Sequence, residues 1–270
     1  MRDLDSNKEW KKWGELDPLF GVSSWRNKNK EGTNPWTNED FYKLGESDWI
    51  DFRRRWEKYG VNNESCIEIG CGAGRITMQL ASYFKEVHAL DVSENMIKYA
   101  KKHITNPLVA FHMSKGIDIP LDDESAYSLF STHVFQHLDS LSVAKDYFAE
   151  IARVLKPNGT LMIHLPIYRW PSNVRGFRQL YAIRKRVADI KANVKRVLMD
   201  FGMAKPIMRG LWYPVEFFYE ELPKFGFDDI EISIFVTKSN NELHPFTFAR
   251  KKTWQDIASD RYSTSLHRGR

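Results

Sequence analysis

Short apolar runs alternate with helical patterns along the middle of the chain. Five of these runs have the composition of β-strands: SCIEIG at 65–70, EVHALD at 86–91, LVAFHM at 108–113, AYSLFST at 126–132 and TLMIHLP at 160–166. Strands that alternate with helices are typical of βαβ units. Two later runs, DDIEISIF at 228–235 and HPFTFARKK at 244–252, flank the turn residues SNNE and predict a hairpin. The pattern predicts an α/β fold around a mostly parallel sheet of seven strands.

Apolar residues between these strands recur at helical spacing. Ile76, Leu80 and Phe84 are four residues apart, as on the buried face of a helix. Ser93 is placed to cap a helix over ENMIKYAKKH, 94–103. A third helix covers 141–155 and is expected to end at the KPNG turn. Right-handed crossovers would distribute such helices over both faces of the sheet, which makes the fold doubly wound.

Two segments fall outside this alternation. Residues 1–60 hold six of the nine tryptophans and a predicted helix over 47–60, and we expect them to form an N-terminal aromatic cap over the open edge of the sheet. Packing of a helical addition against the core is an equally good interpretation. About sixty residues separate the fifth and sixth strands, and a helical insertion at about 167–210 is predicted there within a domain of residues 61–270. The six tryptophans are Trp10, Trp13, Trp25, Trp36, Trp49 and Trp56.

The positive charge of the chain is concentrated in the predicted insertion. Of the 270 residues, those from Arg169 to Asp200 include nine basic and two acidic ones, a local charge of +7 that leaves −2 elsewhere in a total of +5. A charged N-terminal segment and the lack of any run of 18 apolar residues predict a cytoplasmic protein. We interpret Cys66 and Cys71 as buried structural thiols.

The segment CIEIGCGAGRIT, 66–77, places three glycines at alternate positions after the first strand. A Walker phosphate loop needs a lysine and a hydroxyl directly after its last glycine, and neither is present in that arrangement here. A dinucleotide fingerprint has glycines at its first, third and sixth positions, whereas Gly70, Gly72 and Gly74 are first, third and fifth. The loop therefore matches neither phosphate-binding pattern.

Two acidic residues indicate a different ligand. Glu68, two positions before the first glycine, suits a cationic group better than a pyrophosphate, which it would repel. Asp91 ends the next strand, close to the spacing at which a carboxylate meets a ribose diol. A ligand with an amine, a ribose and no phosphate fits both residues, and S-adenosylmethionine is such a ligand.

With E-x-G-x-G-x-G followed by VHALDVSENMI at 87–97, the sequence resembles the class I S-adenosylmethionine-dependent methyltransferases. The resemblance covers 64–166, including DIPLDDESAYSLF at 118–130 and EIARVLKPNGTLMIHLP at 150–166. It implies a Rossmann-like fold, Asp91 at the ribose and Met96 against the adenine. Many members have an acidic residue before the small residue at the adenine, where this chain has Ser114-Lys115-Gly116, so we expect backbone contacts near Gly116. The predicted cofactor-binding residues are Glu68, Gly70, Cys71, Gly72, Gly74, Asp91, Val92, Met96, Ser114, Lys115, Gly116 and His133.

Two histidines are candidates for a catalytic base. Methyl transfer depends mainly on alignment, and a base is needed only where the nucleophile is protonated. His137, in FQHL after the fourth strand, resembles the base of some small-molecule O-methyltransferases, and His164 ends the fifth strand. A structural role for each histidine stays open, as does an inward orientation of His133. No metal site is predicted, because the acidic run Asp122–Glu124 reads as a solvated loop, and we expect chelators to leave activity unchanged.

The sequence leaves four interpretations of the function open, and three of them differ in the methyl acceptor. A small molecule enclosed by the cap and insertion is the commonest arrangement in the family that the chain resembles, and His137 favours oxygen as the acceptor atom. The basic helix at 175–198 also fits a nucleic acid, or a lipid on an anionic membrane. A non-catalytic cofactor-binding module is the fourth. The aromatic residues Trp212, Tyr213, Phe217 and Phe218 either line the acceptor pocket or, as we expect, belong to the core.

Overall fold

The computed structural model describes residues 4–168, 210–239 and 243–253, together with 186–187, 190–191, 194, 198, 208 and 255–256. The predicted basic helix at 175–198 lies mostly outside these ranges. Four apolar residues of that segment, Val187, Ile190, Val194 and Leu198, are described, and each is helical and exposed. Within the described ranges, no helix has both the length and the hydropathy needed to cross a membrane.

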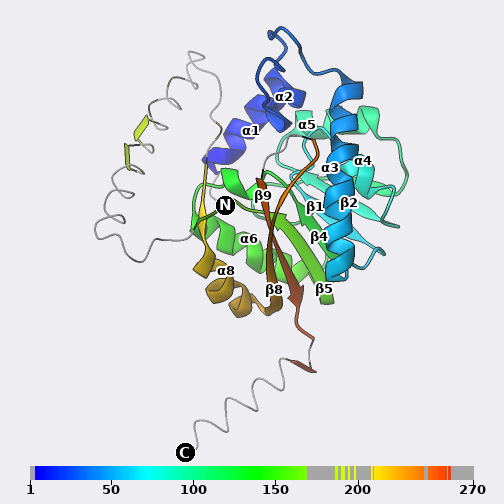
Figure 1. Ribbon diagram of the computed structural model, residues 1–270, viewed down its shortest axis with the longest axis vertical. Coiled ribbons are helices and arrows are strands. Elements are labelled where there is room, and N and C mark those ends of the chain that lie inside the picture. Colours follow the sequence, from blue (N-terminus) through cyan, green and yellow to red (C-terminus); the bar gives the residue numbers. More distant parts are fainter. Residues whose placement is uncertain are drawn as a thin grey trace, which may run out of the picture.

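A seven-stranded sheet in the order β3-β2-β1-β4-β5-β9-β8 forms the centre of the molecule (Figure 1). The first five strands are parallel, and β9 inserts antiparallel between β5 and β8. The predicted five strands, the hairpin and the α/β class are confirmed. The strands are β1 Cys66–Ile69, β2 Val87–Asp91, β3 Val109–Met113, β4 Ala126–Ser131, β5 Leu155–His164, β8 Phe227–Val236 and β9 Leu243–Lys251, while β6 Ile167–Tyr168 and β7 Tyr213–Pro214 form a separate pair.

Helices cover both faces of the sheet (Figure 1). Trp49, Phe52 and Trp56 of α3 pack with Phe130, Phe246 and Phe248 on one face. The other face carries α6 and α8, with Phe148, Phe217 and Phe218 in its core. The helices are α1 Asp5–Leu16, α2 Pro18–Val22, α3 Asn38–Tyr59, α4 Thr77–Leu80, α5 Glu94–His103, α6 Leu141–Val154 and α8 Val215–Glu221, and the short 3₁₀ turns are η1 Phe135–His137 and η2 Leu222–Phe225.

Local sequence signals explain where most of these helices start. The Ser93 hydroxyl accepts the Met96 N–H at the start of α5, as predicted, and Ser140 does the same for α6. One expected boundary was wrong, because α4 spans only four residues and Phe84 packs from a turn. The helix α6 ends at Val154, just before KPNG, as expected. The KPNG residues form an irregularity near the start of β5, between the pairs Ala126–Leu155 and Ser128–Thr160, and Asn158 has a φ of +63° there.

The N-terminal tryptophans divide between two roles. Trp49 and Trp56 are buried in the core, and the Trp56 indole N–H donates to Thr160 Oγ1 of β5 at 3.1 Å. Trp10 and Trp25 instead line a cavity at the edge of the sheet. Among the later aromatic residues, Tyr213, Phe217 and Phe218 belong to the core, as expected, whereas Trp212 is 52% exposed and lines the same cavity.

Candidate active site

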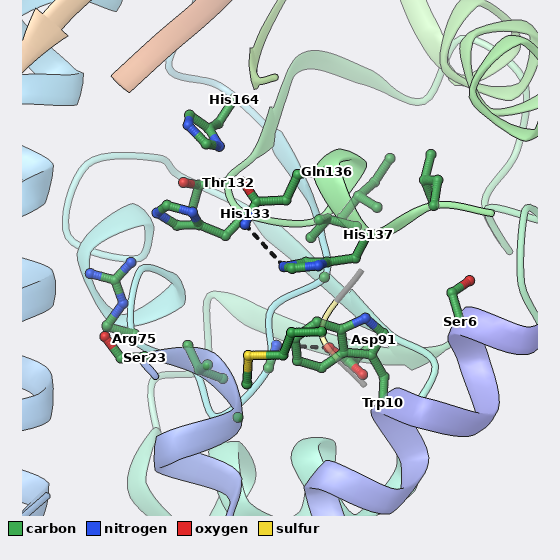
Figure 2. A pocket seen from close by; sticks show the side chains of 18 of the residues that line it. Ser6, Trp10, Ser23, Arg75, Asp91, Thr132, His133, Gln136, His137 and His164 are labelled. Carbon is green, nitrogen blue, oxygen red and sulfur yellow. Dashed lines mark hydrogen bonds between the residues drawn. The ribbon is translucent and has the colours of Figure 1, made fainter. Parts of the chain in front are cut away.

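A cavity of about 760 Å³ lies where the loops after β1, β2 and β4 meet the N-terminal helices. The strand order reverses between β1 and β4, so the connections that leave these two neighbouring strands run in opposite directions along the sheet. Such switch points are where open α/β sheets bind ligands. Figure 2 shows side chains of the strand loops and of α1 directed into the cavity.

The glycine loop forms one wall of this cavity. Gly70 has a φ of +76° and Gly72 one of +52°, in the left-handed region that favours glycine. A Cβ atom on Gly70 would lie 2.1 Å from Val134 Cγ2, so a side chain there would require Val134 or the loop to move. The N–H groups of Gly70 and Cys71 both donate to Leu90 O at 2.8 Å. The backbone of the loop is therefore held against the end of β2.

Asp91 fixes the same loop through its side chain. Its Oδ2 accepts the Gly72 N–H and its Oδ1 accepts the Ser93 N–H, each at 2.8 Å. Burial raises the pKa of Asp91 to about 6, against the opposing effect of these N–H donors. The carboxylate is thus ionised at neutral pH, and each oxygen keeps acceptor capacity for a ligand hydroxyl.

Glu68 lies beneath the loop and is not among the residues that line the cavity. Its Oε2 accepts the Thr77 hydroxyl at 2.5 Å. Burial raises its pKa to about 7, while the Thr77 hydrogen bond and the positive charge of Arg75 lower it. In this position Glu68 can support the glycine loop from the protein interior. It can also act on a ligand in the cavity through its electric field, without touching it.

The loop after β3 lines another part of the cavity with Ser114, Gly116 and Asp118. The Ser114 hydroxyl accepts the Gly116 N–H at 3.1 Å, and the Tyr147 hydroxyl donates to Gly116 O at 2.8 Å. The backbone groups of Gly116 therefore already have partners. Asp118 also lines this part of the cavity. The acidic residue therefore follows the small residue Gly116 in this chain, whereas many members of the family have an acidic residue before the small one.

The N-terminal segment closes one side of the cavity with Ser6, Asn7, Trp10 and residues 21–25. The Asp139 carboxylate, in the loop after η1, accepts the backbone N–H groups of Asp5 and Ser6 at 3.0 and 3.1 Å. These bonds satisfy N–H groups that are otherwise unpaired at a helix start. They connect α1 to the loop that carries His137.

Histidines form the opposite end of the cavity. The rings of His133 and His164 have centroids 4.5 Å apart, and the ring of His244 lies 5.5 and 5.4 Å from them. Burial lowers the pKa of His164 to about 3 and that of His133 well below its usual value, so both imidazoles are neutral at physiological pH. His137 stands nearer α1, with its Nε2 3.0 Å from Gln136 Nε2 (Figure 2).

The structure brings most of the predicted site residues together. Four of them, Glu68, Cys71, Gly74 and Lys115, do not line the cavity. Arg75, Thr132 and His244 line it without having been predicted. For Thr132 the available signal was its place at the carboxyl end of β4, and for Arg75 its place directly after the glycine loop, whereas nothing local marks His244. The predicted residues that line it are Gly70, Gly72, Asp91, Val92, Met96, Ser114, Gly116, His133, His137 and His164.

Within the described part of the chain, no group of three or more metal-ligating side chains is arranged to hold a metal ion. The acidic run before β4 has other partners. Asp123 accepts from Arg153 Nη1 at 2.7 Å, and Glu124 lies 3.4 Å from Lys251 Nζ.

Residues 67–163 match the family model of a methyltransferase domain. Within this stretch the sequence is that of a methyltransferase domain. The match supports the resemblance of its motifs to the class I S-adenosylmethionine-dependent methyltransferases. The Rossmann-like fold is confirmed by similar solved structures, among them the magnesium protoporphyrin IX methyltransferase of Synechocystis with bound S-adenosylhomocysteine, at a TM-score of 0.57 and 15% identity, covering 92% of this chain and 100% of that one.

Two curated relatives match the methyltransferase domain in sequence. A malonyl-[acyl-carrier protein] O-methyltransferase of Hahella chejuensis is 33% identical over 108 residues, which are 38% of this chain and 38% of that protein. An uncharacterized methyltransferase-like protein of Schizosaccharomyces pombe is 34% identical over 122 residues, 44% of this chain and 43% of that protein. The chain thus spans about two fifths of the length of these relatives.

The residues of the cavity fit the cofactor of this family. Asp91 offers acceptors to a ribose, the glycine loop carries no lysine for a phosphate, and Ser6 Oγ on α1 is a buried polar atom with no partner among the described residues. Met96 is 1% exposed and supplies an apolar part of the cavity wall. A nucleoside without phosphate matches this set of groups.

Proposed function

We propose that this protein transfers a methyl group from S-adenosylmethionine to a small-molecule acceptor, with oxygen as the acceptor atom. The observation that carries the proposal is one continuous cavity that joins the Asp91-bound glycine loop to the histidine end. The first part suits the cofactor, and the second offers polar groups to an acceptor. When S-adenosylmethionine is bound, its sulfonium supplies an electrophilic methyl carbon.

Alignment is the main contribution of the chain. Gly70 and Gly72 are fixed to β2 by backbone bonds and by Asp91, so the loop is rigid before a ligand arrives. The segment α1–α2 covers the cavity and excludes water from it. Holding two reactants in line in this way lowers the barrier by as much as ~7–11 kcal/mol.

His137 is the better placed of the two predicted bases. A general base works best with a pKa near the working pH, and the lowered pKa of His164, about 3, makes it a weak base. His164 instead suits hydrogen bonding to the acceptor as a neutral imidazole. His137 lines the same cavity between Gln136 and Trp10, within reach of an acceptor hydroxyl brought there by the cavity walls.

The first test measures labelled methyl transfer from S-adenosylmethionine into a cell extract separated into metabolites, lipids, nucleic acid and protein. We expect label in the metabolite fraction. Asp91→Asn should abolish the transfer, because an amide cannot accept both the Gly72 and Ser93 N–H groups. Glu94→Gln, an exposed change in the neighbouring helix, is the matched control. Label that persists in Asp91→Asn, or appears only in protein, would contradict the proposal.

A lipid acceptor is the second candidate, and the exposed side chains of the insertion favour it. Val187, Ile190 and Val194 are exposed apolar residues at helical spacing, and Arg186 and Lys191 are exposed cations of the same segment. Such residues suit an anionic membrane surface. Label in the lipid fraction, with sedimentation of the protein on anionic vesicles, would favour this candidate over a soluble metabolite.

A further inference from the structure

The part of the chain after β5 contributes an apolar wall to the cavity. Among the described residues that line the cavity after His164, none is an acid, a lysine or an arginine. The charged side chains of the lining lie elsewhere, because Asp91 and Asp118 follow β2 and β3, and Arg75 is paired with Asp48 of α3. This wall therefore suits an uncharged part of a ligand. Its apolar members include Ile167, Trp212, Ile234, Leu243 and Pro245.

Three of these apolar residues reach the surface at the mouth of the cavity. Trp212 is 52% exposed, Ile234 60% and Leu243 67%. Val236 is 46% exposed and extends the group, because it follows Ile234 by two positions on β8 and pairs in register with Leu243 of β9. We call these four residues the mouth patch. Single exposed apolar residues are common on proteins, but a group of them around one cavity indicates a ligand-binding groove.

The backbone beneath the mouth patch is fixed. On one side of Trp212, the Leu211 N–H donates to Gln136 O at 2.6 Å, and on the other side the Tyr213 N–H donates to Pro166 O at 2.8 Å. The other members of the patch lie in the antiparallel ladder of β8 and β9, and β9 pairs in turn with β5. A ligand therefore finds this apolar surface already formed and does not need to order its backbone.

The mouth patch is continuous with the histidine end of the cavity. Leu243 directly precedes His244, whose ring centroid is 5.4 Å from that of His164, and all three residues line the cavity. Burial lowers the pKa of His164 to about 3, so its ring is uncharged at physiological pH. Figure 2 shows His164 at the end away from Asp91 and Trp10. A molecule at the histidine end is thus adjacent to the patch, whereas the cofactor end is not.

A hydrocarbon segment is the ligand part that this surface stabilises. Apolar groups gain free energy when they leave water for an apolar wall, whereas a charged or strongly hydrated group placed against Trp212, Ile234 and Leu243 would lose its hydration without a partner. A second copy of the chain seated on these residues would close the mouth of the cavity. The continuity of patch and cavity therefore favours one ligand that occupies both.

From this continuity we propose that the methyl acceptor is a small amphiphile, whose reacting oxygen lies at the histidine end of the cavity and whose hydrocarbon segment lies on the mouth patch. The inference rests on the proposed function, because it takes the histidine end of the cavity as the acceptor site. The acceptor docks as a single molecule from solution, without a bilayer.

Binding of a homologous series tests the inference without any methyl transfer. The full-length protein is first saturated with S-adenosylhomocysteine, and its binding is measured by calorimetry. Hexane-1,2-diol, octane-1,2-diol and decane-1,2-diol share one polar head and differ in chain length, and they are titrated below their aggregation concentrations and followed by ligand-observed NMR. We expect the affinity to rise about two- to fourfold per added CH₂, because each CH₂ that leaves water stabilises the complex.

Two variants assign this dependence to the mouth patch. Ile234→Ser and Leu243→Ser each remove apolar surface and should weaken decane-1,2-diol about 3–10-fold, with a smaller effect on hexane-1,2-diol and none on S-adenosylhomocysteine. Ile50→Ser is the matched control, because Ile50 is 56% exposed on α3 and does not line the cavity. Its affinities for all three diols should equal those of the parent. Since all three replaced side chains are exposed, Tm should hardly change.

The outcomes separate this inference from the proposed function. Failure of S-adenosylhomocysteine to bind would contradict the proposed function itself. Cofactor binding with no bound diol, or with an affinity that does not rise with chain length, would overturn the amphiphile inference and leave methyl transfer standing. A rise that survives both Ile234→Ser and Leu243→Ser would also overturn it, because the chain would then bind elsewhere.

Two further measurements test other occupants of the mouth patch. Sedimentation velocity reports a second copy of the chain, and a parent dimer that Leu243→Ser dissociates would overturn the inference. Sedimentation with phosphatidylcholine vesicles reports a bilayer, and binding that Leu243→Ser abolishes would overturn it in favour of a membrane contact. We expect a parent protein that stays off the vesicles and whose oligomeric state is the same in Leu243→Ser.

Discussion

The Trp10 ring of α1 stands edge-on to the His137 ring, with centroids 5.0 Å apart and planes inclined at 63°. Together with the Asp139 carboxylate that caps the start of α1, this contact joins the N-terminal segment to the loop after β4. The two residues line the same cavity, so the N-terminal helices complete its wall and position its candidate base.

Replacement of Trp10 should therefore weaken cofactor binding. We expect Trp10→Ala to lower the affinity for S-adenosylhomocysteine about tenfold, because it removes one wall and an aromatic contact worth ~0.5–1.5 kcal/mol in addition to the buried area. Trp10→Phe keeps an aromatic ring and should stay within about threefold of the parent. Calorimetric titration measures both affinities. Equal affinities for all three proteins would show that Trp10 is not part of the cofactor site.

Replacement of His137 should lower the rate of methyl transfer and change substrate binding little. If it removes a proton from the acceptor, His137→Gln lowers kcat roughly 10²-fold or more, changes KM little and removes the acidic limb of the pH–rate profile. His88→Gln is the matched control, because His88 pairs with His112 on β2 and β3 and does not line the cavity. Methyl transfer is measured from pH 5 to 9 for all three proteins. An acidic limb that persists in His137→Gln would exclude this residue as the base.

The residues that the sequence could predict are those whose role depends on local spacing. The alternate glycines, Asp91 at the end of the second strand and the Ser93 cap all follow from short-range pattern. His244 does not, because it reaches His164 only when β9 inserts antiparallel beside β5. The contact of Trp10 with His137 likewise depends on how α1 packs over the loop after β4.

Arg75 shows a further limit of the sequence pattern. It stands directly after the glycine loop, where helix and loop residues face either ligand or core. Its burial against Asp48 depends on the close approach of α3, where a Cβ atom on Gly45 would lie within 2.9 Å of Arg75 Cγ. The sequence therefore places Arg75 near the site, and tertiary packing decides its orientation.

The buried carboxyl of Glu68 should make stability depend on pH. Its pKa is raised from 4.5 to about 7, so between these values the folded protein binds a proton that the unfolded chain releases. Its contribution is fully present below pH 4.5 and is lost as the pH rises through 7. Glu68→Gln has no such group and does not lose this contribution. The free energy of unfolding of the variant, relative to that of the parent, should therefore rise by roughly 3 kcal/mol from pH 4 to pH 8.

Urea denaturation of both proteins at several pH values measures this difference. Glu64→Gln is the control, because Glu64 is exposed and pairs with Lys85 at the surface, and its difference from the parent should hardly change with pH. A Glu68→Gln difference that is equally independent of pH would mean that Glu68 is already ionised in the folded protein at pH 5.

Gly70 should tolerate no side chain, in contrast to another glycine of similar backbone conformation. Gly70→Ala combines a left-handed φ of +76° with a Cβ position 2.1 Å from Val134 Cγ2, whereas Gly226 has a φ of +85° and no atom within 4 Å. The left-handed conformation costs ~1–2 kcal/mol in both, and the overlap adds about 1–3 kcal/mol at Gly70.

We therefore expect Gly70→Ala to lose about 2–5 kcal/mol of unfolding free energy and to bind S-adenosylhomocysteine poorly, because relief of the overlap moves the loop away from Asp91. Gly226→Ala should lose about 1–2 kcal/mol and keep its affinity. Urea denaturation and calorimetry measure the two effects, and equal losses of stability in the two variants would show that Val134 moves aside without displacing the loop.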